Sequence, residues 1–253
     1  MSKNLNIVTY NIQHGTRAWE IIRNILAMAY KKVDVFCLQE VKKVPGKKFI
    51  IDELLWHLGP NWQAQHFNFG LCTVWNNNSV QALDFEELLL PKISNLQPYE
   101  KLFLKLHAKF ERNKVEKITA PQRTALVGEF NIGGQRLRIT NIHLDWHRGF
   151  KHRCSQLEYI RRHLKNKAGV DYEILCGDFN TIGFYRFVNG KLKKVHNLLG
   201  QDFVHHLHKK PTTNHFQMLD HVFVKNLALN KTEILKYSGS DHFPLLAEVK
   251  LQI

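Results

Sequence analysis

Cysteine is scarce in this sequence, which has 253 residues, only four cysteines and no Cys-x-x-Cys pair. A scaffold held together by disulfides would need more cysteine at this length, so that class is excluded. Cys37 and Cys176 lie inside short apolar runs, and we expect both to be buried, reduced thiols. Reduced thiols are typical of the cytoplasm, where we expect the protein to be located.

Long apolar stretches are also missing from the sequence. No apolar run approaches the roughly 18 residues that a membrane-spanning helix needs. Residues 1–6 lack the apolar segment of a secretory signal. We therefore expect a protein that is neither secreted nor embedded in a membrane.

Acidic residues are outnumbered by basic ones, with 22 Asp and Glu against 36 Lys and Arg, a net charge of +14 before any contribution from 15 His. An excess of this size favours a polyanionic partner: nucleic acid, an anionic membrane surface or a phosphorylated substrate. The charge does not distinguish among these three. Aromatic residues are plentiful, with 16 Phe, 7 Tyr and 5 Trp, which excludes a disordered chain.

Apolar runs typical of strands alternate with helical periodicity along the whole chain, without a repeat or a linker. Strands are predicted over 5–10, 33–38, 62–67, 71–75, 124–130, 135–142, 172–176, 203–207, 220–224 and 245–251. Helices are predicted over 17–32, 151–167 and 191–199, and around Ile50, Leu54 and Leu58. This alternation predicts one α/β domain over residues 1–253, built from sheets covered by helices.

The pattern loosens between residues 76 and 121, where Pro91, Pro98 and Pro121 interrupt it. A basic amphipathic helix is predicted over 99–117. The alternation within 101–106 allows a strand instead.

Polar side chains at the ends of apolar strands mark the candidate site, because strands hold side chains rigidly while the adjoining loops open them to substrate. These residues are Asn11, Glu40, Asn141, His143, Asp178, Asn180, Asp220, Asp241 and His242. Three of them, Glu40, Asp178 and Asp241, carry the carboxylates that Mg²⁺ or Mn²⁺ prefers. A hard-cation site is one hypothesis for this set.

Imidazoles complete the same set. His143 and His242 are positioned to stabilise or protonate a developing anion, and Asp220 is the candidate partner that would fix the tautomer of His242. Together with a metal and a carboxylate base, they indicate hydrolysis of a phosphate ester by an activated water. Each residue also has an ordinary structural explanation, such as an Asx turn for Asp178 with Asn180.

The motifs that carry these residues resemble those of the endonuclease/exonuclease/phosphatase superfamily. The matching runs are Thr9-Tyr10-Asn11-Ile12, Leu38-Gln39-Glu40-Val41, Asn141-Ile142-His143-Leu144-Asp145, Cys176-Gly177-Asp178-Phe179-Asn180, Leu219-Asp220-His221-Val222 and Gly239-Ser240-Asp241-His242-Phe243-Pro244. Their order and separation match over essentially the whole chain. That superfamily includes DNase I-like nucleases, inositol polyphosphate 5-phosphatases, neutral sphingomyelinases and tyrosyl-DNA phosphodiesterases.

The resemblance implies a DNase I-like fold: a four-layered α/β sandwich in which two packed mixed β-sheets are flanked by helices, with the site at one edge. By position, Glu40 is similar to the principal metal ligand, with Asn11 and Asp241 nearby in the metal and phosphate shell. Asp178 is similar to the residue that orients or deprotonates the attacking water, and Asn180 to its companion on the phosphate.

The resemblance also implies roles for the remaining residues. His242, paired with Asp220, is similar to the imidazole bonded to the scissile phosphate, and His143 to a second catalytic histidine. Asn141 is expected to bind substrate. Arg123 matches a frequent element before a central strand, where it would contact substrate or form a salt bridge under the site.

The substrate is less clearly indicated. Apurinic endonucleases usually have Tyr at the position of His143 and a Trp-rich run before the Asp220 motif, whereas this chain has Thr212-Thr213-Asn214-His215-Phe216 there. This difference argues against a base-excision repair enzyme. The last two motifs are most similar to bacterial members of unassigned substrate.

Basic residues flank the motifs in sequence and favour nucleic acid, because contacts to several phosphates add affinity. They are Lys101, Lys105, Lys109, Arg112, Lys114, Lys117, Arg148, Lys151, Arg153, Lys191, Lys193, Lys194, Lys209 and Lys210. Any one group of these also fits a solvated helix face. We expect a Mg²⁺-dependent (or Mn²⁺-dependent) phosphodiesterase acting on DNA or RNA, with no obligate protein partner.

Two alternatives remain. A phospholipid or phosphoinositide phosphohydrolase would dock on an anionic membrane through the amphipathic stretch 99–117. A catalytically inactive binding module would keep the fold, although every polar position of the expected site is filled.

Overall fold

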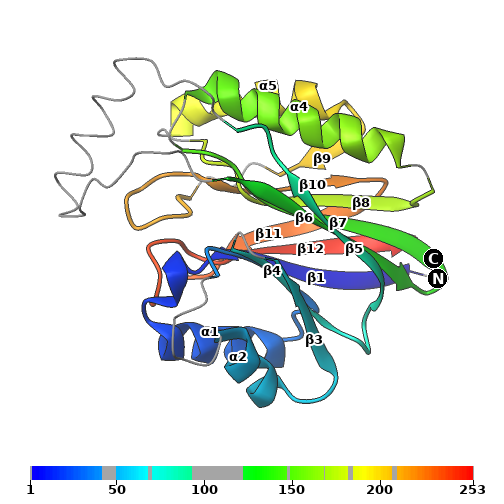
Figure 1. The fold of residues 1–253 in the computed structure, drawn as a ribbon, viewed down its shortest axis with the longest axis vertical. Coiled ribbons are helices and arrows are strands. Elements are labelled where there is room, and N and C mark those ends of the chain that lie inside the picture. The colour runs from blue at the N-terminus through cyan, green and yellow to red at the C-terminus, as the bar shows by residue number, and fades with distance from the viewer. Residues whose placement is uncertain are drawn as a thin grey trace.

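The chain forms two six-stranded sheets packed face to face, with helices on both outer faces (Figure 1). This computed structural model describes residues 2–41, 50–67, 70–92, 122–146, 149–167, 169–181, 185–206 and 210–252. The four-layered α/β sandwich expected from the sequence is confirmed. The helix or strand predicted within 99–117 lies outside the described residues.

The first sheet contains both ends of the described chain. Its strand order is β11-β12-β1-β2-β4-β3, with β1 (Ser2–Asn11), β2 (Val35–Gln39), β3 (Trp62–His66), β4 (Leu71–Asn76), β11 (Ala228–Ile234) and β12 (Leu245–Gln252). β1 and β2 run parallel, and the other neighbours pair antiparallel. The sheet is therefore mixed.

The second sheet repeats this plan. Its order is β5-β6-β7-β8-β10-β9, with β5 (Gln81–Leu89), β6 (Thr124–Ile132), β7 (Gln135–His143), β8 (Tyr172–Asp178), β9 (Phe203–His205) and β10 (Asp220–Lys225). Only β7 and β8 are parallel neighbours. Each sheet thus has one central parallel pair, joined by a crossover that contains a helix.

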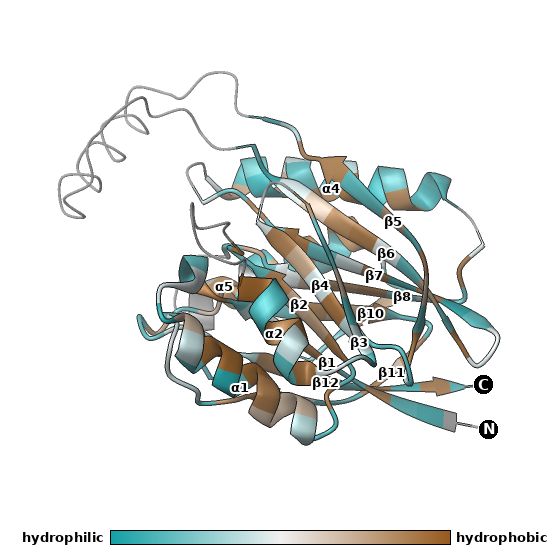
Figure 2. Cartoon of the chain, turned by 60° about the horizontal axis from the view of Figure 1, so that its bottom comes forward, coloured by the Kyte–Doolittle hydropathy of each residue, from teal (hydrophilic) through white to brown (hydrophobic). Residues whose placement is uncertain are grey.

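Amphipathic helices cover the outer faces of the sheets. α1 (Ala18–Tyr30) and α2 (Ile50–Leu58) pack on the first sheet, and α4 (Phe150–Asn166) and α5 (Tyr185–Leu199) pack on the second. In α1, Ile21, Ile22, Ile25 and Met28 recur at helical spacing and are buried. In Figure 2 the central strands are mostly brown (hydrophobic), and the helices carry both brown and teal segments, as expected for amphipathic helices.

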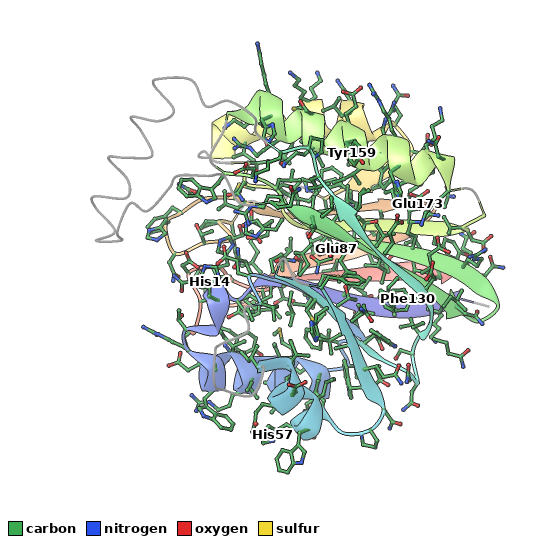
Figure 3. All side chains as sticks on the ribbon, viewed as in Figure 1. His14, His57, Glu87, Phe130, Tyr159 and Glu173 are labelled. Carbon is green, nitrogen blue, oxygen red and sulfur yellow. The ribbon has the colours of Figure 1, made fainter. Side chains whose placement is uncertain are left out.

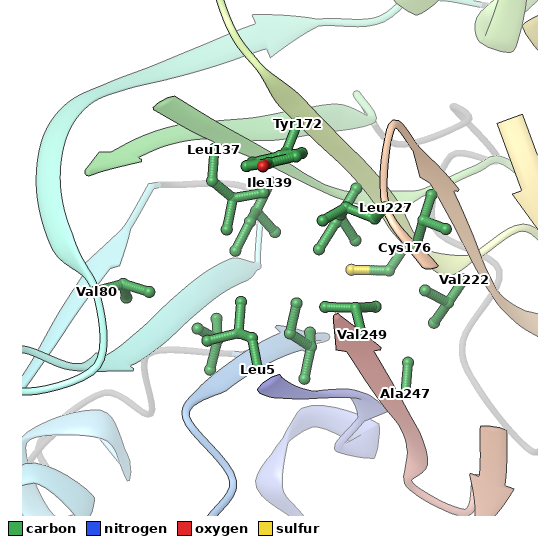
Figure 4. Close-up of a cluster of buried hydrophobic side chains, with 14 of the residues drawn as sticks. Leu5, Val80, Leu137, Ile139, Tyr172, Cys176, Val222, Leu227, Ala247 and Val249 are labelled. Carbon is green, nitrogen blue, oxygen red and sulfur yellow. The ribbon is translucent and has the colours of Figure 1, made fainter. Parts of the chain in front are cut away.

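The central core lies between the two sheets (Figure 4). Leu5 and Val249 from the first sheet meet Ile139, Cys176 and Val222 from the second, all essentially without exposed surface. Each buried aliphatic side chain of this size contributes about 1.5–3 kcal/mol to folding. All four cysteines are free and buried, as expected for Cys37 and Cys176.

Two strands, β5 and β11, were not predicted from the sequence. Both lie at an edge of their sheet, and most of their side chains are exposed or half-buried. Edge strands with little buried surface need no continuous apolar run, so they leave a weak pattern. The helix predicted over 191–199 begins earlier than expected, at Tyr185.

No helix within the described ranges is both long enough and apolar enough to cross a membrane.

Gly177 allows β8 to lie close to β7 immediately before Asp178. Its φ is +140°, and a Cβ built at this position would lie 2.0 Å from the carbonyl oxygen of Ile142 in β7. A side chain here would therefore collide with backbone, which cannot move aside without disrupting the sheet. The position requires glycine.

We predict that Gly177→Ala lowers the free energy of unfolding by at least ~3 kcal/mol, measured by urea denaturation, because overpacking against backbone forces the sheet apart. Gly190→Ala is the matched control. Gly190 lies in α5 with open space around its Cβ position, so this change should stabilise the protein by up to ~1 kcal/mol. If Gly177→Ala and Gly190→Ala had the same free energy of unfolding, the close approach of β8 to β7 at Gly177 would be contradicted.

Candidate active site

The site lies where the parallel strand pairs of both sheets end. Asn11 ends β1, and Glu40 directly follows β2. In the second sheet His143 and Asp178 end β7 and β8 and pair in register, and Asp220 opens β10 opposite Asp178. A crevice outside the carboxyl ends of parallel strands is a usual position for a ligand site. His14, labelled in Figure 3, lies at this edge, away from the chain termini shown in Figure 1.

The Asn11 amide bridges one carboxylate from each sheet. Its Nδ2 lies 3.2 Å from Glu40 Oε1 and 3.2 Å from Asp178 Oδ2. Its Oδ1 accepts a hydrogen bond of 3.0 Å from the backbone N–H of Gln13, which directs Nδ2 toward the carboxylates. In this arrangement Asn11 positions Glu40 and Asp178, and its expected role as a metal ligand stays a prediction.

His143 faces both of these carboxylates. Its Nε2 lies 3.5 Å from Asp178 Oδ2 and 3.9 Å from Glu40 Oε1, while its Nδ1 lies 3.1 Å from Arg123 Nη1. Because a guanidinium only donates hydrogen bonds, His143 Nδ1 must accept, and the ring proton is held on Nε2. Arg123 therefore sets the tautomer of His143, a role that neither of its expected contacts included.

His14 is a site residue that was not predicted from the sequence. Its Nε2 lies 3.1 Å from Glu40 Oε2. It lies three residues after Asn11 in the run Asn11-Ile12-Gln13-His14-Gly15, so its position close to a strand end is the signal that indicates it.

Backbone strain is concentrated around the site. Gln13, His14, Glu40 and Asn180 all have positive φ, between 45° and 60°, a conformation that costs energy for any residue with a Cβ. Strained residues persist only where the surrounding structure holds them in place, and they gather at functional sites. The strain here accompanies the convergence of the polar side chains.

His242 and Asp220 form a buried hydrogen-bonded pair. His242 Nδ1 lies 2.8 Å from Asp220 Oδ2, and its Nε2 faces Asp178 Oδ2 at 3.9 Å. Burial by itself lowers the pKa of His242, but the adjacent Asp220 carboxylate, followed by Asp178, outweighs burial and raises this pKa to about 10. His242 is therefore an imidazolium at neutral pH and presents an N–H toward Asp178.

Asp178 is buried at the centre of the site. Its Oδ1 accepts a hydrogen bond of 2.8 Å from the backbone N–H of Asn180, whose own amide donates to the carbonyl oxygen of Leu144 at 2.8 Å. Burial, together with the charge of Asp220, raises the pKa of Asp178 to about 7, although His242 and the hydrogen bonds oppose this rise. The raised pKa of Asp178 indicates that the positive charge at the centre of the site does not fully offset the negative charge of the carboxylates.

Ser240 fastens the loop that carries His242 to the first sheet. Its Oγ donates to the carbonyl oxygen of Asn11 at 2.7 Å and accepts from the backbone N–H of His242 at 3.1 Å. Asp241, the next residue, is half-buried, and its Oδ1 lies 3.3 Å from Ser240 Oγ. This role of Ser240 was not predicted from the sequence.

The oxygen ligands of this centre fit a hard divalent cation near Glu40. Glu40 is partly exposed, with 22% of its side chain accessible. It lies beside the buried Asp178, whose negative charge is only partly offset by His242. Oxygens of Asp178 and Asp220 and a ring nitrogen of His242 also lie within 4.8 Å of one another. Asp220 has no exposed surface and already binds His242, so we interpret that trio as an electrostatic network in which His242 is hydrogen-bonded to Asp220 and faces Asp178 at 3.9 Å.

Asn141 is not positioned for the substrate contact that we expected. It is fully buried, and its Nδ2 donates to the carbonyl oxygens of Leu38 and Cys72 at 3.0 and 3.1 Å. Its Oδ1 accepts from Gln39 Nε2 at 2.7 Å. Asn141 shares a face of β7 with His143 but lies two residues deeper, between the sheets, because side chains alternate along a strand.

Arg153 is also placed differently from the expectation of a basic surface residue. It is buried, and its Nη1 donates to the carbonyl oxygen of Asp145 at 3.1 Å. Burial lowers its pKa, and the carboxylates of Asp145 and Asp178 oppose this shift. Among the other basic residues, Lys151, Lys193, Lys194 and Lys210 are exposed, whereas Arg148, Lys209 and those within 101–117 lie outside the described residues.

We predict that Asn141→Ala lowers the free energy of unfolding by about 2–4 kcal/mol, because it removes an amide from a buried hydrogen-bonded contact and leaves its partners unsatisfied. The measurement is urea denaturation of both proteins. A variant as stable as the wild type, with only its substrate affinity altered, would return Asn141 to the role first expected.

We predict that the His242 imidazole stays protonated well above neutral pH without divalent ions, because Asp220 stabilises its charge. The contribution of this pair to folding is complete below pH 6.5 and disappears as the pH rises through about 10. In Asp220→Asn the pKa of His242 should fall clearly, because the largest raising influence is lost while burial still lowers the pKa and only the charges of Asp178 and Asp241 still raise it. NMR titration of the His242 ring protons measures both values, and an unchanged pKa in the variant would contradict the pairing.

Comparison with known proteins agrees with the fold. Residues 8–242 match the model of the Endonuclease/Exonuclease/phosphatase family, and no curated protein sequence matches the chain. One similar structure is an endonuclease/exonuclease/phosphatase from Bacteroides vulgatus, with a TM-score of 0.71 and 16% identity, covering 99% of this chain and 100% of that chain. A second is D. rerio TDP2 complexed with single strand DNA product, with a TM-score of 0.68 and 13% identity, covering 98% of this chain and 99% of that chain. A third is the human Nocturnin catalytic domain with bound sulfate anion, with a TM-score of 0.66 and 16% identity, covering 97% of this chain and 94% of that chain. The chain belongs to the endonuclease/exonuclease/phosphatase family.

Proposed function

We propose that this protein is a Mg²⁺- or Mn²⁺-dependent phosphodiesterase that hydrolyses DNA or RNA with an activated water. One observation carries the proposal: residues from opposite ends of the chain and from both sheets converge on one edge. Glu40 contributes a partly exposed carboxylate, Asp178 a buried one, and His242 an imidazolium supported by Asp220. An acid, a base and a cation site together are what hydrolysis of a phosphate ester requires.

Asp178 is the proposed base. The backbone N–H of Asn180 fixes its Oδ1, and its Oδ2 faces the centre of the site, where Asn11 and His143 also point. A water held at Oδ2 transfers a proton to the carboxylate as its oxygen attacks phosphorus. The bond from phosphorus to the leaving oxygen then breaks, and the leaving oxygen keeps the bonding electron pair and takes up a proton from solvent.

His242 is the proposed stabiliser of the phosphate. In its charged form it directs Nε2–H into the site, and Asp220 holds both the charge and the orientation of the ring. A preorganised cationic donor of this kind favours the transition state, in which negative charge grows on the non-bridging oxygens. His143 Nε2–H, oriented by Arg123, supplies a second donor at the same centre.

Glu40 and Asp241 are the residues proposed to hold the cation, with Asn11 positioning Glu40. When bound, such an ion supplies positive charge that makes water more acidic and offsets the charge of the phosphate. Oxygen ligands at this position favour Mg²⁺ or Mn²⁺.

Three features favour nucleic acid as the substrate. The chain has a net charge of +14, and the similar TDP2 structure contains a single-stranded DNA product. Phe216 is 72% exposed and has a φ of +58°, in a loop whose Asn214 donates to the carbonyl oxygen of Asp241. An exposed ring on a loop that is hydrogen-bonded to Asp241 is suited to stacking on a base.

The alternatives have less support. Docking of a phospholipid hydrolase on a membrane depended on residues 99–117, which lie outside the described residues. An inactive binding module does not require the convergence of Glu40, Asp178 and His242 at one edge. We retain the cytoplasm as the proposed location, because all four cysteines are free.

We predict that the protein cleaves plasmid DNA or an RNA oligonucleotide with Mg²⁺ or Mn²⁺ but not with EDTA. Asp178→Asn should lower the rate by at least ~100-fold, because it removes the base. Gel assays of both substrates measure this. Wild-type protein that leaves both intact while releasing phosphate or phosphocholine from lipids would contradict the proposal and favour a lipid substrate.

The same variant distinguishes loss of chemistry from loss of structure. The pKa of Asp178 is raised above its ordinary value of 3.8 to about 7, so this carboxyl destabilises the folded state progressively as the pH rises from about 3.8 to about 7, and by a constant amount above that. At about pH 8 without divalent ions, Asp178→Asn should be more stable than the wild type by about 1–2 kcal/mol. A less stable variant would indicate a structural role for the carboxylate.

A further inference from the structure

An open cleft adjoins the site on the side of Asp241, and the proposed mechanism does not use it. It has a volume of about 340 Å³, within the usual range for small ligands. Its walls come from three separate parts of the chain: the turn after β1, the loop around Asn214, and the loop 236–243 that precedes β12. Ser240 and Asp241 belong to the cleft and to the edge of the site at once, so the two are continuous.

Two cations line this cleft. Arg17 is 65% exposed and lies 3.6 Å from Glu20, a loose surface pair that contributes little. Lys236 has no acidic partner within the part of the chain that the structure describes. Asp241 is the acid in the lining, and it lies at the end where the cleft meets the site. Both cations are therefore available to an anion that enters from solvent.

Aromatic rings complete the lining. Tyr237 and Phe243 are half-buried and border the cleft from the same loop. The loop is held firmly, since Asn214 donates to the carbonyl oxygens of Asp241 at 2.8 Å and Ser240 at 3.2 Å. Rings on a fixed loop offer stacking surfaces to bases, and the adjacent cations suit a phosphate backbone.

We propose that this cleft binds a nucleotide adjacent to the scissile phosphate, with Arg17 and Lys236 contacting its phosphate and Tyr237 and Phe243 contacting its base or sugar. This inference rests on the proposed function and extends it. A substrate whose scissile phosphate lies at His242 continues past Ser240 and Asp241 into the cleft. The enzyme therefore selects nucleic acid strands over small phosphate esters, which fill only the catalytic centre.

The test compares two substrates and two double variants. Arg17→Ala with Lys236→Ala should weaken binding of a short fluorescein-labelled single-stranded oligonucleotide by about 10-fold in EDTA, measured by fluorescence anisotropy. The slope of log affinity against log salt should become shallower by about 1.4, because two phosphate contacts are lost at about 0.7 each for a single strand. Hydrolysis of bis(p-nitrophenyl) phosphate should stay within about twofold of the wild type, because this small diester does not reach the cleft.

Lys31→Ala with Lys250→Ala is the matched control, since both lysines are exposed on other parts of the protein and the net charge changes equally. If both double variants lost the same oligonucleotide affinity, the loss would result from the change in net charge alone, and the proposal would be overturned. Unchanged oligonucleotide binding in Arg17→Ala with Lys236→Ala would also overturn it, as would a parallel fall in both substrates. Failure of the proposed function is a separate result: the wild type would bind the oligonucleotide without cleaving it, and the binding comparison would still decide the role of the cleft.

Discussion

The arrangement of the site depends on a buried polar contact between the two sheets. Gln39 at the end of β2 donates to Asn141 in β7, and the Asn141 amide donates back to the carbonyl oxygens of Leu38 and Cys72. The apolar core holds the sheets together, but hydrophobic burial is not directional and tolerates small displacements. Hydrogen bonds in a dry interior do not tolerate them. Because Glu40 follows Gln39 and His143 lies two residues beyond Asn141, this contact sets the spacing of the site.

The electrostatics of the centre follow from this convergence. Glu40, Asp178 and Asp220 meet in a largely buried space, where the positive charges of His242 and Arg123 offset only part of the negative charge. Together with burial, the excess of negative charge raises the pKa of Asp178, because ionisation would add to it, and against burial it raises the pKa of His242, because protonation offsets it. Together with the positive φ values around the site, it indicates that folding stability is lowered here to keep reactive groups close together.

The catalytic centre and the cleft have different consequences for function. A centre of carboxylates and imidazoles can act on many phosphate esters, and a shared fold does not identify the substrate. Selection among substrates depends on the surfaces beside the centre. Here those surfaces are loops, including the turn with Arg17 and the loop with Lys236 and Tyr237, which a rigid pair of sheets holds in place.

The sequence by itself determined the buried strands, the α/β class and most of the polar site, because buried strands need continuous apolar runs and the site residues lie within short motifs at strand ends. It did not determine the edge strands β5 and β11, whose exposed side chains leave little pattern. Nor did it determine the burial of Asn141 and Arg153, the contact of His14 with Glu40, or the meeting of Arg17 with Lys236 in one cleft. Only the tertiary structure decided these, because they depend on how distant segments pack against each other, and spacing along the chain does not encode that distance.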